Sequence, residues 1–300
     1  MLTDFFRLNT PYITIGSQEE LLRLLNNSRD LRDALYEPVD LKPDIYHPTV
    51  KIRETVFTNV SFSKTKIIQI VFVNCKFIDC LFIGAEVLKC EFQNCKFTNC
   101  NPYKIIISET YINPKNFSHC IKQISKANIA VHLFQQLLQN SDEKTQSKFT
   151  REAEYQFKNW QNKLTLNKFK NKQPYPISIF QFLRSYPINW LYKWTFGYGL
   201  RLRNFVVTFL IIFCSFYFLN AAKWKSYDLH FKDVEISSFN KDSSTIQANF
   251  LYTLDATTKI VDSQFQARSY SGMSWLTFQN IVGFILLSGL VTIIINRFVK

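Results

Sequence analysis

The chain has 300 residues, of which 47% are hydrophobic and 16% aromatic, and its formal net charge is +13. This length and composition suit two or three modules with buried cores, which excludes a generally disordered chain. The charge is uneven, because residues 1–114 hold 13 basic and 13 acidic side chains whereas residues 115–203 hold 15 and 4. The second segment can therefore meet lipid headgroups, nucleic acid or another polyanion, or it is a solvated surface beside a membrane.

The amino-terminal segment, residues 1–54, is expected to cap the module that follows it. No secretory signal is expected, because "MLTDFFRLNT" lacks a long apolar core behind a basic start. A helix is predicted at "SQEELLRLLNN", where Ser17 and Glu20 form a capping box ahead of a run of leucines. We therefore expect one cap of that module to be helical.

Residues 55–114 repeat with a period of five, which fits neither an α-helix nor a single strand. Every fifth residue is large and apolar, and the residue two positions before it is smaller. The large residues are Phe57, Phe62, Ile67, Phe72, Phe77, Phe82, Val87, Phe92 and Phe97. This pattern predicts a coil that turns a corner at each repeat. Five of the seven cysteines fall in the repeat, which favours reduced apolar fillers over disulfides or zinc ligands.

The repeat resembles the pentapeptide-repeat family, whose members form a right-handed, quadrilateral β-helix with both repeated positions pointing inward. The resemblance implies about three coils, with Phe57, Phe77 and Phe97 stacked about 4.8 Å apart on one face. Some relatives imitate DNA with an acidic surface, but this repeat is not acidic, which disfavours that role. A rigid scaffold or spacer is the simplest use of such a module.

A basic helical connector, residues 115–203, comes next. Apolar residues recur at helical spacing from residue 116 to 172 without proline or glycine, so we expect two helices separated by a turn at 140–146. The aromatic residues of the second helix can pack in a core, or they can stack on bases while lysines meet phosphates of a nucleotide or nucleic acid. The candidate contacts for an anionic ligand are Lys158, Lys163, Lys168, Lys170 and Lys172.

Residues 204–300 are predicted to form a membrane domain. Two uncharged apolar stretches, 204–222 and 274–296, are long enough to cross a hydrocarbon layer about 30 Å thick. Basic residues precede the first stretch and follow the second, so the positive-inside rule places both chain ends in the cytoplasm. The sequence therefore predicts a multi-pass protein in contact with membrane lipid.

The order of these parts resembles bacterial pentapeptide-repeat proteins fused to a two-helix ion channel domain. The channel half of the resemblance rests on "FGYGLRLRNFVVTFLII" and "FQNIVGFILLSGLVTIIINRF". It implies a homotetramer in the bacterial inner membrane, in which the segment between the spans returns as a pore helix and a filter of backbone carbonyls surrounds the permeant ion. The chain departs from that pattern because "NFLYTLDATTKIVDS" has no Gly-Tyr-Gly, and Gly197–Gly199 precedes the first span. Potassium selectivity therefore does not follow.

Two sets of residues are candidates for the wall of a pore. Ser288, Thr292 and Asn296 recur at four-residue spacing on the second span, where polar groups should face protein or water. Alternatively, they hydrogen-bond to neighbouring helices or to carbonyls of their own helix. The second set precedes the second span and comprises Thr257, Thr258, Asp255 and Asp262, the two aspartates as cation-attracting charges.

No enzymatic function and no cofactor are expected, because the four histidines are dispersed and no phosphate-cradling glycine loop is present. Two functions remain. The first is a homotetrameric, ligand-gated ion channel whose cytoplasmic solenoid and basic helices control the pore, for example as a stress or antiphage effector opened by a nucleotide or oligonucleotide. The second is a non-conducting, membrane-anchored interaction scaffold.

Overall fold

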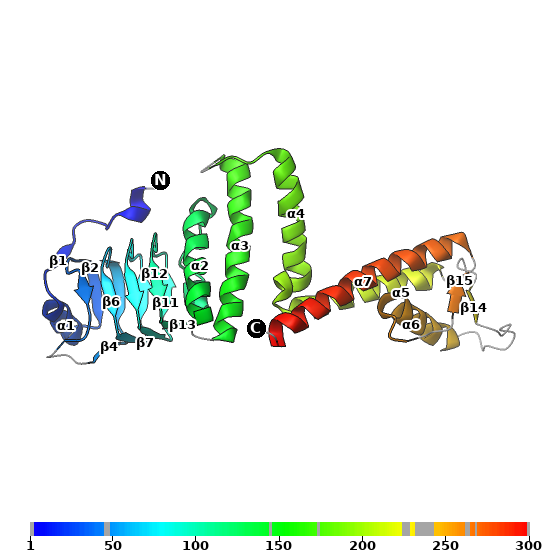
Figure 1. Ribbon diagram of the computed structural model, residues 1–300, viewed down its shortest axis with the longest axis horizontal. Coiled ribbons are helices and arrows are strands. Elements are labelled where there is room, and N and C mark those ends of the chain that lie inside the picture. The colour runs from blue at the N-terminus through cyan, green and yellow to red at the C-terminus, as the bar shows by residue number, and fades with distance from the viewer. Residues whose placement is uncertain are drawn as a thin grey trace. The chain divides into compact units, whose positions relative to one another are not determined.

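The computed structural model describes residues 3–44, 49–143, 146–172, 175–223, 229–231, 243–261, 265–267 and 269–298. The chain separates into two compact units, Met1–Pro187 and Ile188–Lys300. The first unit holds a β-solenoid and the helices that follow it, and the second holds two long apolar helices (Figure 1).

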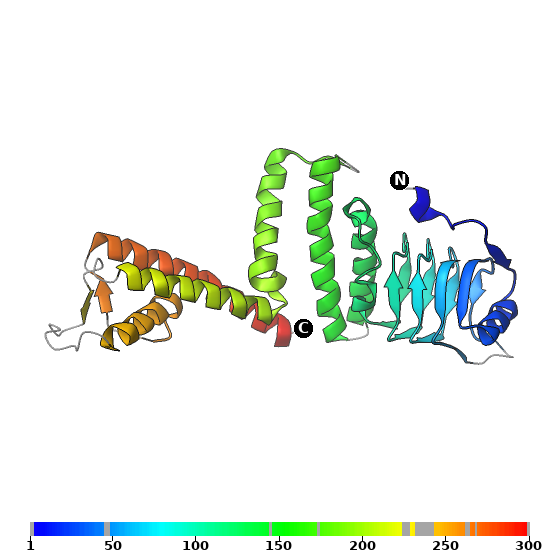
Figure 2. The same cartoon turned by 180° about the vertical axis from the view of Figure 1, so that it is seen from behind.

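The solenoid has about five turns of parallel strands, which lie side by side in Figure 2. One sheet has the order β1 (Ile13–Ile15), β2 (Asp30–Tyr36), β5 (Val56–Ser61), β8 (Lys76–Ile78) and β11 (Lys96–Thr98). A second has the order β13 (Tyr111–Ile112), β10 (Glu91–Gln93), β7 (Ile70–Val73) and β4 (Val50–Arg53). A third has the order β12 (Ile106–Ser108), β9 (Glu86–Leu88), β6 (Lys66–Ile68) and β3 (Asp40–Leu41).

The predicted phenylalanine stack is confirmed. Phe57 pairs with Phe77 and Phe77 with Phe97, so successive turns repeat every four pentapeptides. The ring centroids of these pairs are 4.9 and 4.7 Å apart, and the ring planes differ by 3° and 7°. Stacked rings that are almost fully buried give each turn its apolar contact with the next.

The solenoid is longer than the three coils that the resemblance implies. Strands β2, β3 and β4 belong to the segment expected to be a cap, yet they pair with β5, β6 and β7. Their inward residues, such as Leu31, Tyr36 and Leu41, are buried but separated by loops of unequal length. The strict period of five is therefore lost in a segment that still forms a turn.

Each corner of the solenoid adopts a left-handed backbone conformation. Every fifth residue from Glu54 to Glu109 has a positive φ, and Gly84 is the one glycine among them. Asparagine and aspartate tolerate this conformation best, and side chains of neighbouring turns join there, as when Asn94 Nδ2 donates to Asn74 Oδ1 at 2.9 Å. The corners thus form ladders outside the apolar core.

The solenoid cysteines are free and buried, as the repeat indicates. The thiol of each cysteine in the repeat also lies within hydrogen-bond distance of two carbonyls, one two residues back and one in the preceding turn, and its single proton can be donated to either. Cys80 Sγ, for example, lies 3.4 Å from both Ile78 O and Phe57 O. Burial raises the pKa of Cys90 to about 11, and the pKa of Cys80 well above its usual value. At these repeats the smaller inward position is thus occupied by a thiol, which is a weak hydrogen-bond donor.

Helices cover both ends of the solenoid. At one end α1 (Gln18–Asn27) begins as predicted, with Glu20 N–H donating to Ser17 Oγ at 3.1 Å. The other end is followed by 3₁₀ turns η2 (Pro114–Phe117) and η3 (Ile124–Lys126), and by α2 (Ala127–Glu143) and α3 (Ser147–Asn171). Asn140 of α2 bonds with Thr110 of the last turn in both directions, at 2.8 and 2.7 Å. The predicted helical pair is confirmed.

Helix α4 (Ile179–Phe196) crosses the boundary between the units and leads into η4 (Gly197–Gly199). The second unit continues with α5 (Leu202–Lys223), α6 (Ser243–Thr258) and α7 (Tyr270–Phe298), and strands β14 (Leu229–Phe231) and β15 (Phe265–Ala267) form an antiparallel pair. Helices α5 and α7 are long and apolar enough to cross a membrane. Only 17% and 22% of their most apolar windows are buried, whereas a core helix of a soluble protein is mostly buried.

Candidate functional site

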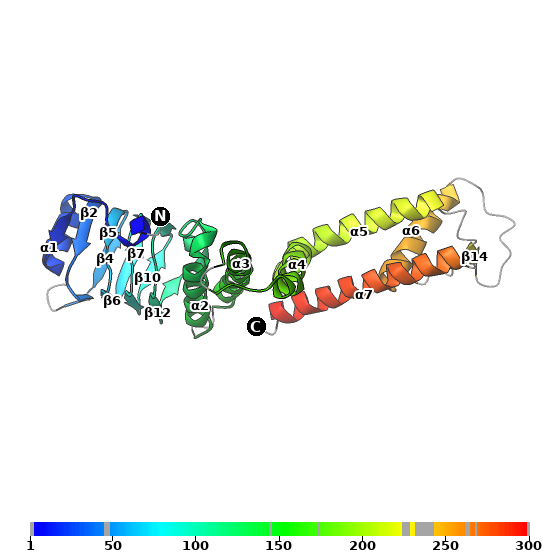
Figure 3. The same ribbon diagram turned by 90° about the horizontal axis from the view of Figure 1, so that it is seen from above.

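The candidate pore-forming site is the three-helix group of α5, α6 and α7, in which α6 lies beside both long helices (Figure 3). Buried polar side chains join the three helices. Asn220 Nδ2 of α5 donates to Thr253 Oγ1 of α6 at 2.8 Å, and Gln279 Nε2 of α7 donates to Asn220 Oδ1 at 2.7 Å. These three residues are fully buried. In an apolar layer such bonds hold helices together, because their loss leaves polar groups without partners.

The end of α6 packs directly on the backbone of α7. A Cβ added to Gly283 would lie 1.9 Å from Thr257 O, so only glycine permits this approach. Gly283 lies near the middle of α7, and α6 has only 16 residues. Helix α6 is therefore too short to be a third span, and it ends about halfway along α7.

The residues predicted to line a pore near the end of α6 lie in different environments. Thr257 and Thr258 are buried inside the unit, where their hydroxyls each donate at 2.7 Å to the carbonyl four residues earlier. Asp255 forms an ion pair with Lys259 at 3.1 Å, which compensates its charge. Asp262 lies outside the described residues. Neither of the two threonines therefore reaches the surface of the unit.

The polar stripe of α7 divides into two parts. Ser288 and Thr292 are exposed, and their hydroxyls donate to Phe284 O at 2.8 Å and to Ser288 O at 3.0 Å. Asn296 instead donates to Gly199 O at 3.0 Å. Thr277, which the four-residue spacing did not include, is exposed and lies on the same helix face as Ser288, about three turns earlier. Exposed hydroxyls thus line one face of α7.

Gly-Tyr-Gly forms a joint between α4 and α5 at the carboxyl end of α7. Gly197, Tyr198 and Gly199 have φ values of 55°, 60° and 75°. A Cβ on Gly199 would lie 3.2 Å from Thr292 Cγ2, and one on Gly289 would lie 2.0 Å from the Phe196 ring. The joint therefore contacts the same end of α7 that carries part of the polar stripe.

The candidate lysines of α3 do not form one patch. Lys158 pairs with Glu154 at 2.8 Å, and the ammonium of Lys163 lies 3.7 Å from the centroid of the Trp160 ring. A helical repeat of about 3.6 residues places Lys163 and Lys170 on one face and directs Lys158 and Lys168 elsewhere. Lys172 is exposed at the left-handed carboxyl cap of the helix.

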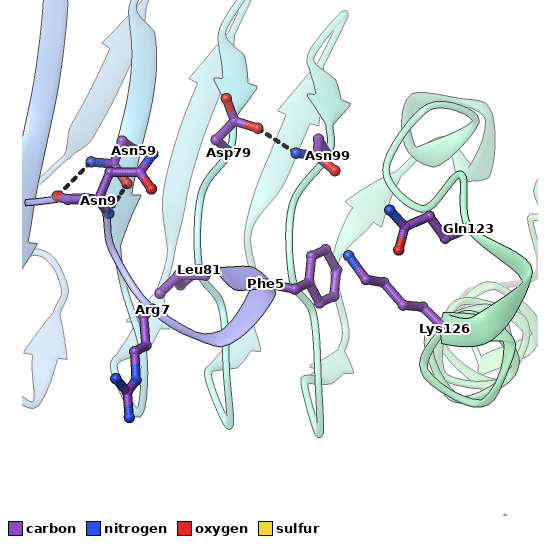
Figure 4. A pocket seen from close by; sticks show the side chains of 9 residues that line it. All are labelled: Phe5, Arg7, Asn9, Asn59, Asp79, Leu81, Asn99, Gln123 and Lys126. Atoms are coloured by element: carbon purple, nitrogen blue, oxygen red, sulfur yellow. Dashed lines mark hydrogen bonds between the residues drawn. The ribbon is translucent and has the colours of Figure 1, made fainter. Parts of the chain in front are cut away.

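A polar cavity of about 350 Å³ lies between the chain segment around Phe5 and the face of the solenoid (Figure 4). Many of its amides already have partners within the fold, since Asn99 Nδ2 donates to Asp79 Oδ1 at 2.5 Å and Asn59 exchanges hydrogen bonds with the Asn9 backbone. Lys126 extends toward Phe5, with its ammonium 3.3 Å from the ring centroid. The cavity is lined by Phe5, Arg7, Asn9, Asn59, Asp79, Leu81, Asn99, Gln123 and Lys126. Its size and mixed charges suit a small polar molecule.

Comparisons with models of protein families, with curated proteins and with solved structures found no match to this chain. The class of protein is therefore defined by the fold and the site themselves. The chain is a β-solenoid protein followed by helices, two of which are long and apolar enough to cross a membrane.

Proposed function

We propose that the protein is a homo-oligomeric ion channel of a bacterial inner membrane, with cytoplasmic termini and a right-handed, four-sided pentapeptide-repeat solenoid that controls the pore. The observation that carries this proposal is the end of α6 against Gly283, between two helices of membrane length. A helix that ends inside an apolar layer needs protein or water around its last carbonyls, which is the arrangement found beside pores.

The exposed face of α7 supports an assembly of several copies. It carries the hydroxyls of Thr277, Ser288 and Thr292 among large apolar residues such as Phe284 and Ile295. A tetramer with these faces turned inward would place the hydroxyls toward water and leave the apolar face of α5 toward lipid. Such a pore is mainly apolar and has no glycine filter, which favours weak ion selectivity.

The solenoid unit is the proposed sensor. An anionic ligand such as a nucleotide or oligonucleotide is favoured by the basic excess in residues 115–203. Lys163 and Lys170 are its first candidate contacts, because they lie within about 20° of each other around α3. The polar cavity beside Phe5 is a second candidate place for a small ligand. Gating requires that the ligand bind one state of the pore more tightly than the other. Ligand-triggered ion flow would suit a stress or antiphage effector.

The channel is tested by ion flux through liposomes that contain the full-length protein. Ser288→Trp places a bulky ring on the exposed face of α7, and Ile211→Trp places the same ring on the exposed face of α5. We expect Ser288→Trp to abolish flux and Ile211→Trp to preserve it. Equal flux in both variants would contradict the assignment of the pore to α7. Absence of flux in the unsubstituted protein, with nucleotides and short oligonucleotides tried, would favour the non-conducting scaffold.

The ligand is tested separately with the same liposomes. Lys163→Glu combined with Lys170→Glu should reduce binding of a labelled oligonucleotide and its effect on flux, and the loss should be smaller at high salt. Lys158→Glu is the matched control, because Lys158 lies on another face and is paired with Glu154. Equal binding by the double variant and the control would assign the basic excess to another role.

A further inference from the structure

Helix α4 has an inner apolar face that packs on protein. The ring of Phe182 stacks on Phe169 of α3 at 4.1 Å, and Tyr186 stacks on Phe182 at 4.9 Å. Farther along, Phe196 is buried and its ring lies 6.3 Å from that of Phe205 on α5. These contacts define the inner face of α4.

The same helix has a second, outer apolar face. Seven residues fall within about 120° of its circumference, and all of them are exposed. They are Ile179, Phe180, Leu183, Pro187, Trp190, Leu191 and Trp194. The side chains other than Pro187 are 48% to 75% exposed, which is far more apolar surface than a helix in water normally presents.

The last turn of α4 is fixed beside the first turns of α5. Asn204 Nδ2 donates to Lys193 O and Thr208 Oγ1 donates to Thr195 O, both at 3.2 Å. Asn204 and Thr208 belong to the beginning of the apolar helix. Trp194 therefore lies at the level where α5 would enter a bilayer.

The charges that flank the outer face have one sign. Arg184 and Lys193 of α4 lie just outside its two edges, and residues 155–203 of the sequence contain nine basic and no acidic side chains. Basic segments next to a span are attracted to anionic lipid headgroups, and tryptophan prefers the boundary between headgroups and acyl chains. A second copy of α4 would bring like charges at Arg184 and Lys193 close to the first, which disfavours a direct pairing of two α4 helices.

We infer that α4 lies along the membrane surface, with its outer face in the boundary layer of anionic phospholipids. The inference rests on the proposed function only in requiring that α5 and α7 cross the bilayer. Pro187 fits this position, because it has no N–H for the Leu183 carbonyl, and on an exposed face that carbonyl can accept from water or a headgroup.

Tryptophan fluorescence of the full-length protein in vesicles containing phosphatidylglycerol tests this inference. The quenchers are lipids brominated near the headgroup, lipids brominated near the acyl-chain ends, and aqueous iodide. The signal of α4 is the difference between the unsubstituted protein and Trp190→Phe combined with Trp194→Phe, which keeps an aromatic ring at both positions. We expect shallow bromine to quench this difference signal about twofold more than deep bromine, and iodide to quench it little.

The control adds Ile211→Trp, at an exposed position near the middle of α5, to the double phenylalanine variant. Deep bromine should quench this residue if α5 crosses the bilayer. Quenching of the α4 signal by iodide, strongest quenching by deep bromine, or no quenching by any agent would each overturn the inference. If deep bromine also fails to quench Ile211→Trp, the assignment of α5 as a membrane span is contradicted. If deep bromine quenches Ile211→Trp, only the placement of α4 at the membrane surface is contradicted.

Arg184→Glu combined with Lys193→Glu provides a second readout that leaves the apolar face intact. In phosphatidylglycerol vesicles this variant should lose about half of the shallow-bromine quenching or more, whereas in neutral phosphatidylcholine vesicles it should differ little from the parent protein. Unchanged quenching in the anionic vesicles would contradict a contribution of anionic headgroups to the binding of α4.

Discussion

Replacing Gly283 by alanine should loosen the junction of α6 with α7. The added methyl carbon would begin 1.9 Å from Thr257 O and 2.7 Å from Thr257 C, and both atoms are backbone. An ordinary contact between carbon and oxygen needs about 3.2 Å, so α6 must retreat by about 1.3 Å. Thr253 lies one turn before Thr257 on α6, so this retreat also strains the 2.8 Å hydrogen bond between Asn220 and Thr253. Overpacking costs about 1–3 kcal/mol, and a bond of this kind about 0.6 kcal/mol within a membrane.

Unfolding in mixed detergent micelles, followed by the fluorescence of Trp275, measures this loss. Trp275 reports on the junction because its Nε1 donates to Asn220 Oδ1 at 2.9 Å. We expect Gly283→Ala to lower the free energy of unfolding by about 2–4 kcal/mol. Ser288→Ala is the matched control on the same helix, since it removes only an exposed hydroxyl bonded to its own helix. If the two variants unfold at the same midpoint, the close packing of α6 on α7 is refuted.

Three further predictions concern the solenoid. Phe77→Ala removes the ring that lies between Phe57 and Phe97 in the stack. We expect it to lower the free energy of unfolding in urea by about 3–5 kcal/mol, and a loss below about 1 kcal/mol would contradict the stacked core. Gly84→Ala should lower the free energy of unfolding by about 1–2 kcal/mol. The cause is backbone strain alone, because φ is 64° and the new methyl group would meet only Lys64 Cγ, at 3.9 Å. An unchanged melting temperature would argue against a left-handed corner. The urea midpoint should fall as pH rises from about 9 to about 11, because the unfolded chain releases cysteine protons that the folded chain retains at buried thiols such as Cys90 and Cys80. Cys90→Ala should make that slope shallower without abolishing it, and an equal slope in both proteins would exclude Cys90 as a contributor.

The sequence predicts the solenoid core almost residue by residue, because its period is set by geometry that repeats without interruption. Phe57, Phe77 and Phe97 stack as the repeat requires. The first turn is missed because loops of unequal length separate Leu31 and Leu41, so the inward residues share no fixed spacing. The hand of the coil stays a prediction.

The second unit is less predictable, because its contacts join residues that are far apart in the chain. The apolar stretches give α5 and α7 directly, and glycines on α7 indicate close approach. That Gly283 receives the end of α6 while Gly289 receives the Phe196 ring depends on the packing of the whole unit. The sequence does not predict the outer face of α4, because Pro187 lies inside this helix and proline is unfavourable in a helix interior.

The pairing of each residue with its equivalent one turn later limits how the solenoid can change in length. An inserted full turn would preserve the inward side of every later residue and move the exit of the chain along the axis without rotating it. An inserted single pentapeptide would rotate that exit by about a quarter turn. The solenoid can therefore act as a spacer. The number of its pentapeptides sets the direction in which the chain leaves it, and that direction changes in discrete steps.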